Sequence, residues 1–321
     1  MKQRAHELDS LERYTVASEA AAAKIIESYS TSFGAATKML GIRHRSHVRN
    51  IYALVRVADE LVDGATEQAN ISVDLQHVLL DQLEAETYRA IDIGYSSNPI
   101  VHAFAHTARV SHIGTDLISP FFHSMRTDLP PSIVATAATA AVRESADAAD
   151  AQQHADRQVF SASKHEEYVY GSAEVVGLMC LKVFVREESL TPEQHEQLVF
   201  GARRLGAAFQ NVNFLRDLAD DTDRLGRSYL SEAGQIDDAE KDRWVAEIRA
   251  QIDDAVSVLP LLPKDARIAV DSALRLFERL TDRVAAASTA DLYEKRVRVS
   301  NLEKTLLVAT AALDLRKEIS R

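Results

Sequence analysis

Long stretches of helical periodicity, with almost no strand-like alternation, constrain this 321-residue chain more than any other feature. Apolar residues recur at helical spacing over about 19–40, 47–62, 73–93 and 193–219. Glycine (11) and proline (7) both fall well below their usual shares of roughly 7% and 5%. These patterns predict an all-α protein. An apolar content of 46% is enough for one large core, so we expect a single domain over residues 1–321.

Charge and cysteine content limit the partners and the compartment. The net charge of −11 argues against nucleic acid, whose phosphates require a basic surface. Cys180 is the only cysteine, which favours a reducing, cytoplasmic location. Residues 1–14 lack an apolar signal segment, and the longest apolar runs fall short of the ~18 residues of a membrane span. The basic cluster at 43–49 is compatible with weak peripheral membrane binding or with an ordinary exposed helix start.

Two carboxylates on an otherwise apolar helix indicate a first cation site. Asp59 and Asp63 are four residues apart, and Arg56 precedes Asp59 by three, so all three project from one helical face. Like charges at this spacing repel each other, and a bound cation between them would explain their presence. A solvated helix end running into Gly64 is the alternative interpretation.

A polar stripe on a second helix indicates another cation site. At ~100° per residue, Gln210, Asn213, Asp217 and Asp221 fall within an arc of roughly 80°. Large apolar residues occupy the other directions of this helix, so an ordinary exposed face does not explain the stripe. Carboxylate and amide oxygens suit a hard cation, and magnesium prefers a few carboxylates together with phosphate oxygens and water.

These two helices and three further motifs follow one another along the chain in the same order as in the head-to-head prenyl synthases. The chain therefore resembles this family, which contains the phytoene, dehydrosqualene and squalene synthases. The resemblance covers most of the chain, and its motifs lie at 29–33 (YSTSF), 51–63, 168–177 (YVYGSAEVVG), 210–230 and 295–304. The chain departs from the family pattern in three places: Asp-Glu at 59–60 instead of Asp-Asp, Ser231 instead of a proline, and a partial match over 122–128 (FHSMRTD). The 135–156 segment matches no family motif.

The resemblance implies an isoprenoid-synthase-like helical bundle around a deep central cavity. It implies roles for the residues that match the motifs. The implied metal ligands are Asp59, Asp63, Asn213, Asp217 and Asp221. The implied catalytic residues are Asp59, Asp63, Tyr168, Gln210, Asp217 and Asp221. The implied substrate-binding residues are Ser30, Ser32, Phe33, Thr37, Tyr52, Arg56, Tyr170, Ala173, Gly177, Arg216, Arg227, Tyr229, Arg296 and Lys304.

The implied reaction joins two geranylgeranyl diphosphates, through a cyclopropylcarbinyl diphosphate, to phytoene in carotenoid biosynthesis. It would use Mg²⁺, with Mn²⁺ as a substitute, and no NADPH. The small Thr37, one turn beyond Phe33, favours the twenty-carbon substrate unless it merely packs between helices. The rivals are a squalene or dehydrosqualene synthase using farnesyl diphosphate, a class I terpene cyclase and a non-enzymatic helical scaffold. The sequence predicts no oligomeric state.

Overall fold

The protein is all-helical, as predicted, apart from one pair of two-residue strands. The computed structural model describes residues 8–131, 158–159, 161–219, 227–228, 230, 235–300, 303, 306–307 and 310–311. The strands β1 (Gln158–Val159) and β2 (Arg227–Ser228) pair in parallel. The helices are α1 (Ser10–Tyr29), α2 (Thr31–Met39), α3 (Ile42–Asp63), α4 (Ala65–Gln68), α5 (Val73–Ile93), α6 (Pro99–Ser111), α7 (Thr115–Thr127), α9 (Ala162–Val169), the π-helical turn η2 (Tyr170–Glu174), α10 (Val175–Val185), α11 (Pro192–Arg216), α13 (Asp238–Val258), the 3₁₀ turn η3 (Leu259–Leu261), α14 (Lys264–Ala286) and α15 (Thr289–Glu294). The 135–156 segment lies outside the described residues.

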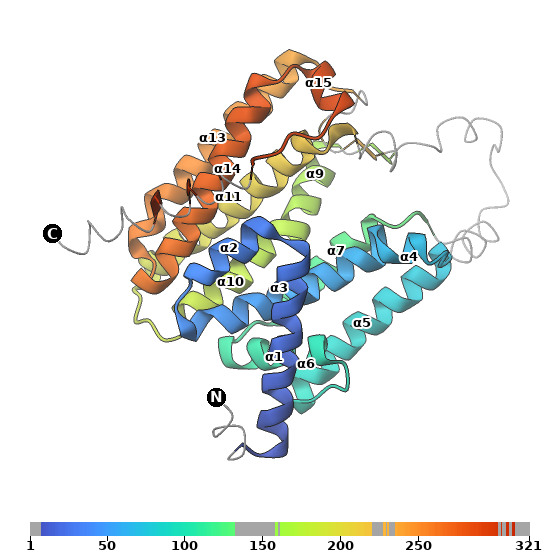
Figure 1. The fold of residues 1–321 in the computed structure, drawn as a ribbon, viewed down its shortest axis with the longest axis vertical. Helices are drawn as coiled ribbons and strands as arrows, with labels where there is room; N and C mark the ends of the chain where they lie inside the picture. Colours follow the sequence, from blue (N-terminus) through green and yellow to red (C-terminus); the bar gives the residue numbers. More distant parts are fainter. Residues whose placement is uncertain are drawn as a thin grey trace.

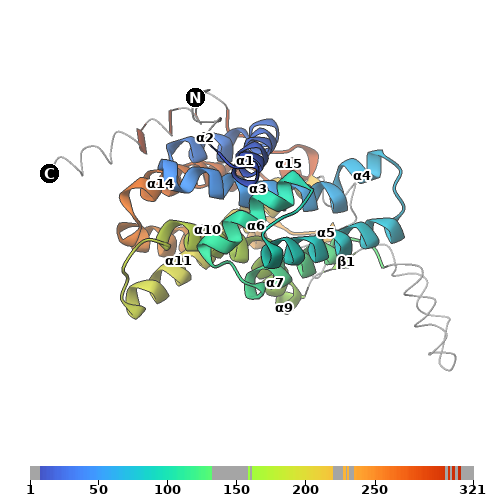
Figure 2. The ribbon, with the colours of Figure 1, turned by 90° about the horizontal axis from the view of Figure 1, so that it is seen from below.

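The helices form a bundle with two ends and a shared middle (Figure 1). Helices α11, α13 and α14 pack side by side at one end, and α1, α5 and α6 pack around the other. Between them, α3 contacts α1, α5, α6 and α10, so it joins the two groups. The view from below shows α2 and α14 on one side of α3 and α10 on the other (Figure 2). One apolar core cluster runs from Leu40 to Leu292 through both groups.

The predicted helix over 19–40 is interrupted in the structure. Ser30 is extended (φ −133°, ψ 111°), and it separates α1 from α2. Its Oγ accepts a hydrogen bond from the backbone N–H of Phe33 at 3.0 Å, which caps α2. Apolar periodicity continues across such a break because both helices face the same core, so the sequence pattern concealed it. The break sets the direction in which Phe33 and Thr37 point.

Two residues of the basic cluster at 43–49, Arg43 and His44, take part in an ion network at the start of α3. Arg43 Nε binds Asp265 at the start of α14 at 2.8 Å, and its Nη atoms bind Glu187 and Glu188 after α10 at 3.1 and 2.8 Å. His44 is fully buried and lies 3.2 Å from the same Asp265. The cluster does lie at the start of a helix, but Arg43 and His44 are paired with acidic residues of other elements. These contacts fasten the start of α3 to two other helices.

Stability should fall in mild acid because of His47. Burial, reinforced by the charge of Arg186, lowers the pKa of His47 to about 4. In the unfolded chain His47 binds a proton near pH 6.5, whereas in the folded protein it does so only near pH 4. The free energy of unfolding therefore falls as the pH falls through this window. Urea unfolding between pH 7.5 and pH 4.5 measures the slope. His47→Gln should reduce this slope of stability against pH, whereas His195→Gln, at an exposed position of α11, should leave it unchanged. Equal slopes for His47→Gln and the natural protein would contradict the expectation.

Helices α9, η2 and α10 form one continuous apolar segment, Ala162–Val185. By length and composition alone it could cross a membrane, with a mean hydropathy of 1.4, whereas the sequence pattern predicted no such segment. Its most apolar window is 44% buried against other parts of the protein, and a core helix passes the same test. It packs against α7 and α11, and glycines make both approaches close.

Gly206 of α11 permits one of these close contacts. A Cβ there would lie 2.8 Å from the Ala173 carbonyl oxygen and 2.8 Å from the Glu174 Cα, and backbone cannot yield easily. We expect Gly206→Ala to lower the free energy of unfolding by about 1–3 kcal/mol. Gly34→Ala is the matched control, because its Cβ would meet only the Ile26 carbonyl oxygen at 3.7 Å. That helical substitution should stabilise by about 0.5–1 kcal/mol. Urea unfolding of both variants measures their free energies of unfolding, which should change in opposite directions.

Candidate active site

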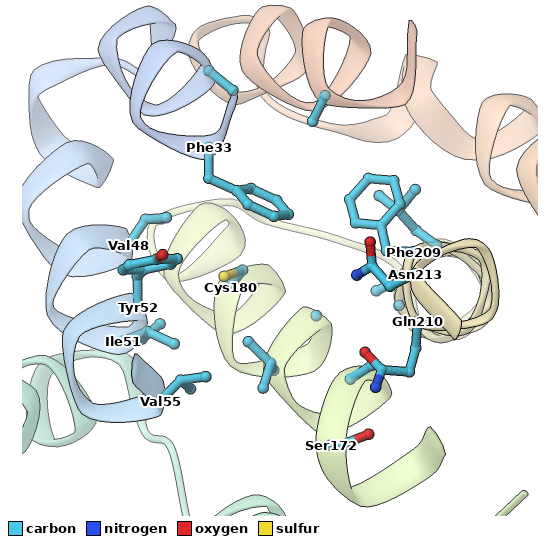
Figure 3. Close-up of a pocket in the computed structure, with 18 of the residues that line it drawn as sticks. Phe33, Val48, Ile51, Tyr52, Val55, Ser172, Cys180, Phe209, Gln210 and Asn213 are labelled. Atoms are coloured by element: carbon cyan, nitrogen blue, oxygen red, sulfur yellow. The ribbon is translucent and has the colours of Figure 1, made fainter. Parts of the chain in front are cut away.

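A cavity of about 590 Å³ lies in the middle of the bundle, between α2, α3, α10, α11 and α14. Figure 3 shows side chains from these elements converging on it. Val48 and Asp63 of α3 both line it, and their separation of fifteen residues corresponds to ~22 Å along the helix. The predicted site residues on its wall are Phe33, Thr37, Tyr52, Arg56, Asp59, Asp63, Tyr168, Ala173, Gly177, Gln210, Asn213, Arg216, Asp217 and Arg296.

The first acidic helix supplies one side of the polar end of this cavity. Asp59 and Asp63 both line it, so both carboxylates face the cavity. Burial, reinforced by the neighbouring Asp128 and Asp63 charges and opposed by Arg56, raises the pKa of Asp59 to about 7. The side chain still keeps 40% of its surface accessible because it faces the cavity. A positive ligand in the cavity would relieve this unfavourable charge.

Glu60, where the family pattern has a second Asp, is not among the residues that line the cavity. Its carboxylate pairs with Arg56 and accepts the backbone N–H of Ala65 at 3.0 Å. The Arg56 guanidinium also lies 4.4 Å from the centre of the Tyr29 ring. The departure from the family pattern therefore changes the support of Arg56 and leaves the facing carboxylates unchanged.

The second polar stripe lines the facing wall, but the predicted helix ends early. Gln210, Asn213 and Asp217 line the cavity. Helix α11 stops at Arg216, and Asp217 leaves helical geometry with φ −104° and ψ 13°. Two arginines hold its carboxylate: Arg216 Nε at 2.8 Å and Arg296 Nε at 2.7 Å. The prediction of an unbroken helix to residue 219 is wrong here, because the backbone departs from helical geometry at Asp217. Asp221 lies outside the described residues.

Oxygen atoms on the cavity walls could hold a cation only together with a ligand that supplies further oxygens. Within the described ranges, no three His, Cys, Asp or Glu side chains are close enough together to hold one ion. The Asn213 Oδ1 atom, however, is buried on the cavity wall without a hydrogen-bond partner. An unpaired buried oxygen is costly unless a ligand or ion satisfies it. Hard oxygen donors on two facing walls fit magnesium ions that share a diphosphate as a common ligand.

Asp128 is a polar residue of the site that the sequence did not single out. It is only 6% exposed and lines the cavity next to Met125. The Tyr168 hydroxyl lies 2.9 and 2.8 Å from its two carboxylate oxygens. Asp128 therefore orients Tyr168 and adds negative charge beside Asp59. The partial family match over 122–128 was the only sequence signal for it.

The deeper part of the cavity is apolar and aromatic. Phe33 lies between Tyr52 and Phe209, with ring centres 6.4 and 5.9 Å away (Figure 3). Thr37 is 5% exposed, and its hydroxyl donates to the Gly34 carbonyl at 3.1 Å, so its methyl group is free to face the cavity. Cys180 also lines the wall, where burial raises the pKa of its thiol to about 12. Such walls suit hydrocarbon tails.

Several predicted substrate-binding residues have other surroundings. Neither Ser30, which caps α2, nor Tyr170, whose ring lies 5.3 Å from the Arg203 guanidinium, is among the residues that line the cavity. Gly177 lines it, but a Cβ there would lie 2.8 Å from the Ala202 carbonyl oxygen, so its small size mainly serves helix packing. The Ser32 and Arg227 side chains, Tyr229 and Lys304 lie outside the described part of the chain.

Comparison with known proteins agrees with this geometry. The family profile described as squalene/phytoene synthase matches residues 26–234. A 4,4'-diapophytoene synthase of Staphylococcus haemolyticus is 26% identical over 65% of this chain and 61% of its own length. Phytoene synthase 3 of Zea mays is 26% identical over 90% of this chain and 64% of its own. The chain thus spans less than two thirds of each of these relatives.

A solved structure matches the fold almost end to end. The crystal structure of a dehydrosqualene synthase in complex with ligand superposes with a TM-score of 0.71 at 22% identity, and the match covers 96% of this chain and 100% of the other. The helical bundle around a central cavity is thereby confirmed as the fold. The two sequence relatives carry different product names, so they leave the product open.

Proposed function

The chain belongs to the squalene/phytoene synthase family, and from this premise we propose that it joins two allylic prenyl diphosphates head to head, with geranylgeranyl diphosphate as the preferred substrate. The observation that carries the proposal is a cavity that combines carboxylates and arginines at one end with apolar side chains along the rest. A non-enzymatic scaffold would not need the unpaired Asn213 oxygen and the unfavourable Asp59 charge on facing walls of one cavity.

The length of the cavity supports the twenty-carbon substrate. An extended chain advances roughly 1.2 Å per bond, so a geranylgeranyl tail spans about 18 Å and a farnesyl tail about 13 Å. The wall from Asp63 to Val48 extends ~22 Å along α3. This extent exceeds the length of the longer tail, and the small Thr37 side chain lies on the wall of the same cavity. The product of two such tails would be phytoene, which places the reaction in carotenoid biosynthesis.

The polar end would bind and release the diphosphate. We propose that Asp59, Asp63, Asn213 and Asp217, with Asp221, hold Mg²⁺, for which Mn²⁺ can substitute. The metal, when bound, would neutralise the diphosphate and so assist its departure. Arg56, Arg216 and Arg296 face the same space and would bind the leaving group through charge-assisted hydrogen bonds. Arg216 and Arg296 would exchange their bonds to Asp217 for bonds to phosphate oxygens.

The apolar part would protect the cationic carbons. The double bond of the second molecule would attack the allylic cation of the first, and loss of a proton would close the ring of a cyclopropylcarbinyl diphosphate. Departure of the second diphosphate, rearrangement and loss of a second proton would then give the hydrocarbon. Bulk water would destroy these cations, so an enclosed hydrocarbon wall is needed. The Tyr168 ring and the Gln210 carbonyl dipole lie between the polar and apolar parts, where they would stabilise positive charge.

One assay tests the proposal directly. The pure protein is incubated with Mg²⁺ and with farnesyl or geranylgeranyl diphosphate separately, with and without NADPH, and the extracted hydrocarbon is identified. We expect phytoene from geranylgeranyl diphosphate, unchanged by NADPH and abolished by excess EDTA. Squalene formation on addition of NADPH would contradict the product assignment. Absence of any diphosphate release from either substrate would contradict the enzyme assignment.

We also propose a cytoplasmic location with weak peripheral binding to membranes. The support is chemical: the proposed hydrocarbon product is insoluble in water and must leave into lipid. Within the basic cluster, Arg43 is already paired with Asp265. Sedimentation with anionic liposomes measures the binding, and complete absence of cosedimentation would contradict it.

A further inference from the structure

Arg56 lines the cavity, but two of its contacts come from residues that do not. Its Nη2 atom pairs with the Glu60 carboxylate, and its guanidinium carbon lies 4.4 Å from the centre of the Tyr29 ring. Neither Glu60 nor Tyr29 is among the residues that line the cavity. The Nη1 atom lies 3.9 Å from Oδ2 of Asp59, and Nε is buried without a hydrogen-bond partner among the described residues. Arg56 is therefore held from outside the cavity lining, with a donor left for a ligand.

Glu60 is itself fixed at both of its carboxylate oxygens. Oε1 pairs with Arg56, and Oε2 accepts the backbone N–H of Ala65, the first residue of α4, at 3.0 Å. Gly64 leaves room for this arrangement, because a Cβ there would lie 2.5 Å from Oε2. The Glu60 side chain keeps only 21% of its surface accessible. A carboxylate that is tied to the backbone through one oxygen can hold an arginine side chain in one orientation through the other.

We propose that Glu60 is a positioning residue, which fixes the Arg56 guanidinium so that its unpaired Nε–H donates to a diphosphate oxygen. The inference rests on the proposed function, which supplies the diphosphate. A mobile arginine side chain loses rotational freedom when it binds a ligand, and this loss weakens binding. A side chain that an ion pair already restricts loses less. Glu60 thus strengthens binding of the leaving group without touching it.

The charge of Glu60 acts in the opposite direction from its positioning role. A carboxylate beside the site repels a diphosphate, so on charge alone its removal should strengthen diphosphate binding. Glu60→Gln removes the charge and leaves one acceptor oxygen, which cannot serve both Arg56 and the Ala65 N–H. If positioning dominates, this variant should bind diphosphate more weakly even though the site has become more positive. The sign of the change therefore separates the two effects.

Isothermal titration of the full chain with inorganic diphosphate, at a fixed Mg²⁺ concentration, measures this change without turnover. We expect Glu60→Gln to weaken diphosphate binding by about five- to tenfold, since one long side chain must then be immobilised by the ligand. Glu60→Asp keeps the charge, but its shorter side chain cannot keep both contacts, so it should also weaken binding. Glu27→Gln is the matched control, because Glu27 is an exposed carboxylate two residues before Tyr29, and it should not weaken binding.

An Arg56→Gln background separates the positioning role from other roles of Glu60. In this background Glu60→Gln should cause no further weakening, because the side chain that it positions is gone. Equal weakening in both backgrounds would show that Glu60 acts independently of Arg56, which overturns the inference. Unchanged or tighter diphosphate binding by Glu60→Gln alone would also overturn it, and either result leaves the proposed function intact. If the natural protein neither bound inorganic diphosphate nor released it from geranylgeranyl diphosphate, the proposed function would fall and the inference with it.

Discussion

Asp59→Ala and Asp217→Ala are each expected to lower turnover by about a hundredfold or more. Both residues line the polar end of the cavity from facing elements, α3 and the end of α11. Their loss would remove oxygen ligands for the cation that neutralises the diphosphate, an interaction needed in the transition state. Steady-state turnover at saturating Mg²⁺ measures the effect. Retention of more than about a tenth of the activity, equivalent to less than ~1.4 kcal/mol, would contradict the two-wall metal site.

The fold should survive both substitutions, which separates a catalytic loss from unfolding. Burial penalises the charged form of Asp59, so its removal should leave the stability of the metal-free protein unchanged or raised. Asp217 lies at a helix end, where its loss breaks only the ion pairs with Arg216 and Arg296. Circular dichroism and thermal unfolding check this expectation. Glu196→Ala, on the exposed face of α11, is the matched control and should keep full turnover.

Thr37→Phe should shift the substrate preference from geranylgeranyl towards farnesyl diphosphate. Thr37 is buried on the cavity wall, one turn deeper than Phe33, so a phenyl ring there would occupy the channel of the longer tail. Displacing packed side chains costs roughly 1–3 kcal/mol, which corresponds to about a 5- to 150-fold loss of turnover on the longer substrate. The shorter tail ends before the obstruction and should lose little.

Competition between the two substrates, with products identified by chain length, measures this shift. Lys38→Phe is the matched control, because Lys38 is the exposed neighbour of Thr37 on the same helix. It should leave the preference unchanged. Wild-type turnover of geranylgeranyl diphosphate by Thr37→Phe, without a gain on farnesyl diphosphate, would show that Thr37 only packs between helices and would remove the main residue-level support for a twenty-carbon substrate.

The helix content and the polar stripes could be predicted from the sequence because both depend on local spacing. The predicted helix at 73–93 matches α5, which ends at Gly94 in the left-handed conformation that glycine favours. Asp59 and Asp63, or Gln210 and Asn213, share a face wherever the backbone is helical, so their common direction followed from the 3.6-residue period. The ordered motifs then indicated the family, and the family profile confirms it.

The tertiary structure decided everything that depends on partners distant in sequence. Arg296 holds Asp217 from 79 positions away, and this contact, with Arg216, accompanies the end of the predicted helix. Asp265, 222 positions from Arg43, turns a basic cluster into an ion network. Asp128 belongs to the site because the end of α7 lies against Tyr168. The Ser172 hydroxyl can be recognised as unpaired only once its neighbours in the folded protein are known. Periodicity records which face of a helix is apolar, whereas long-range charge pairing and helix packing decide what that face meets.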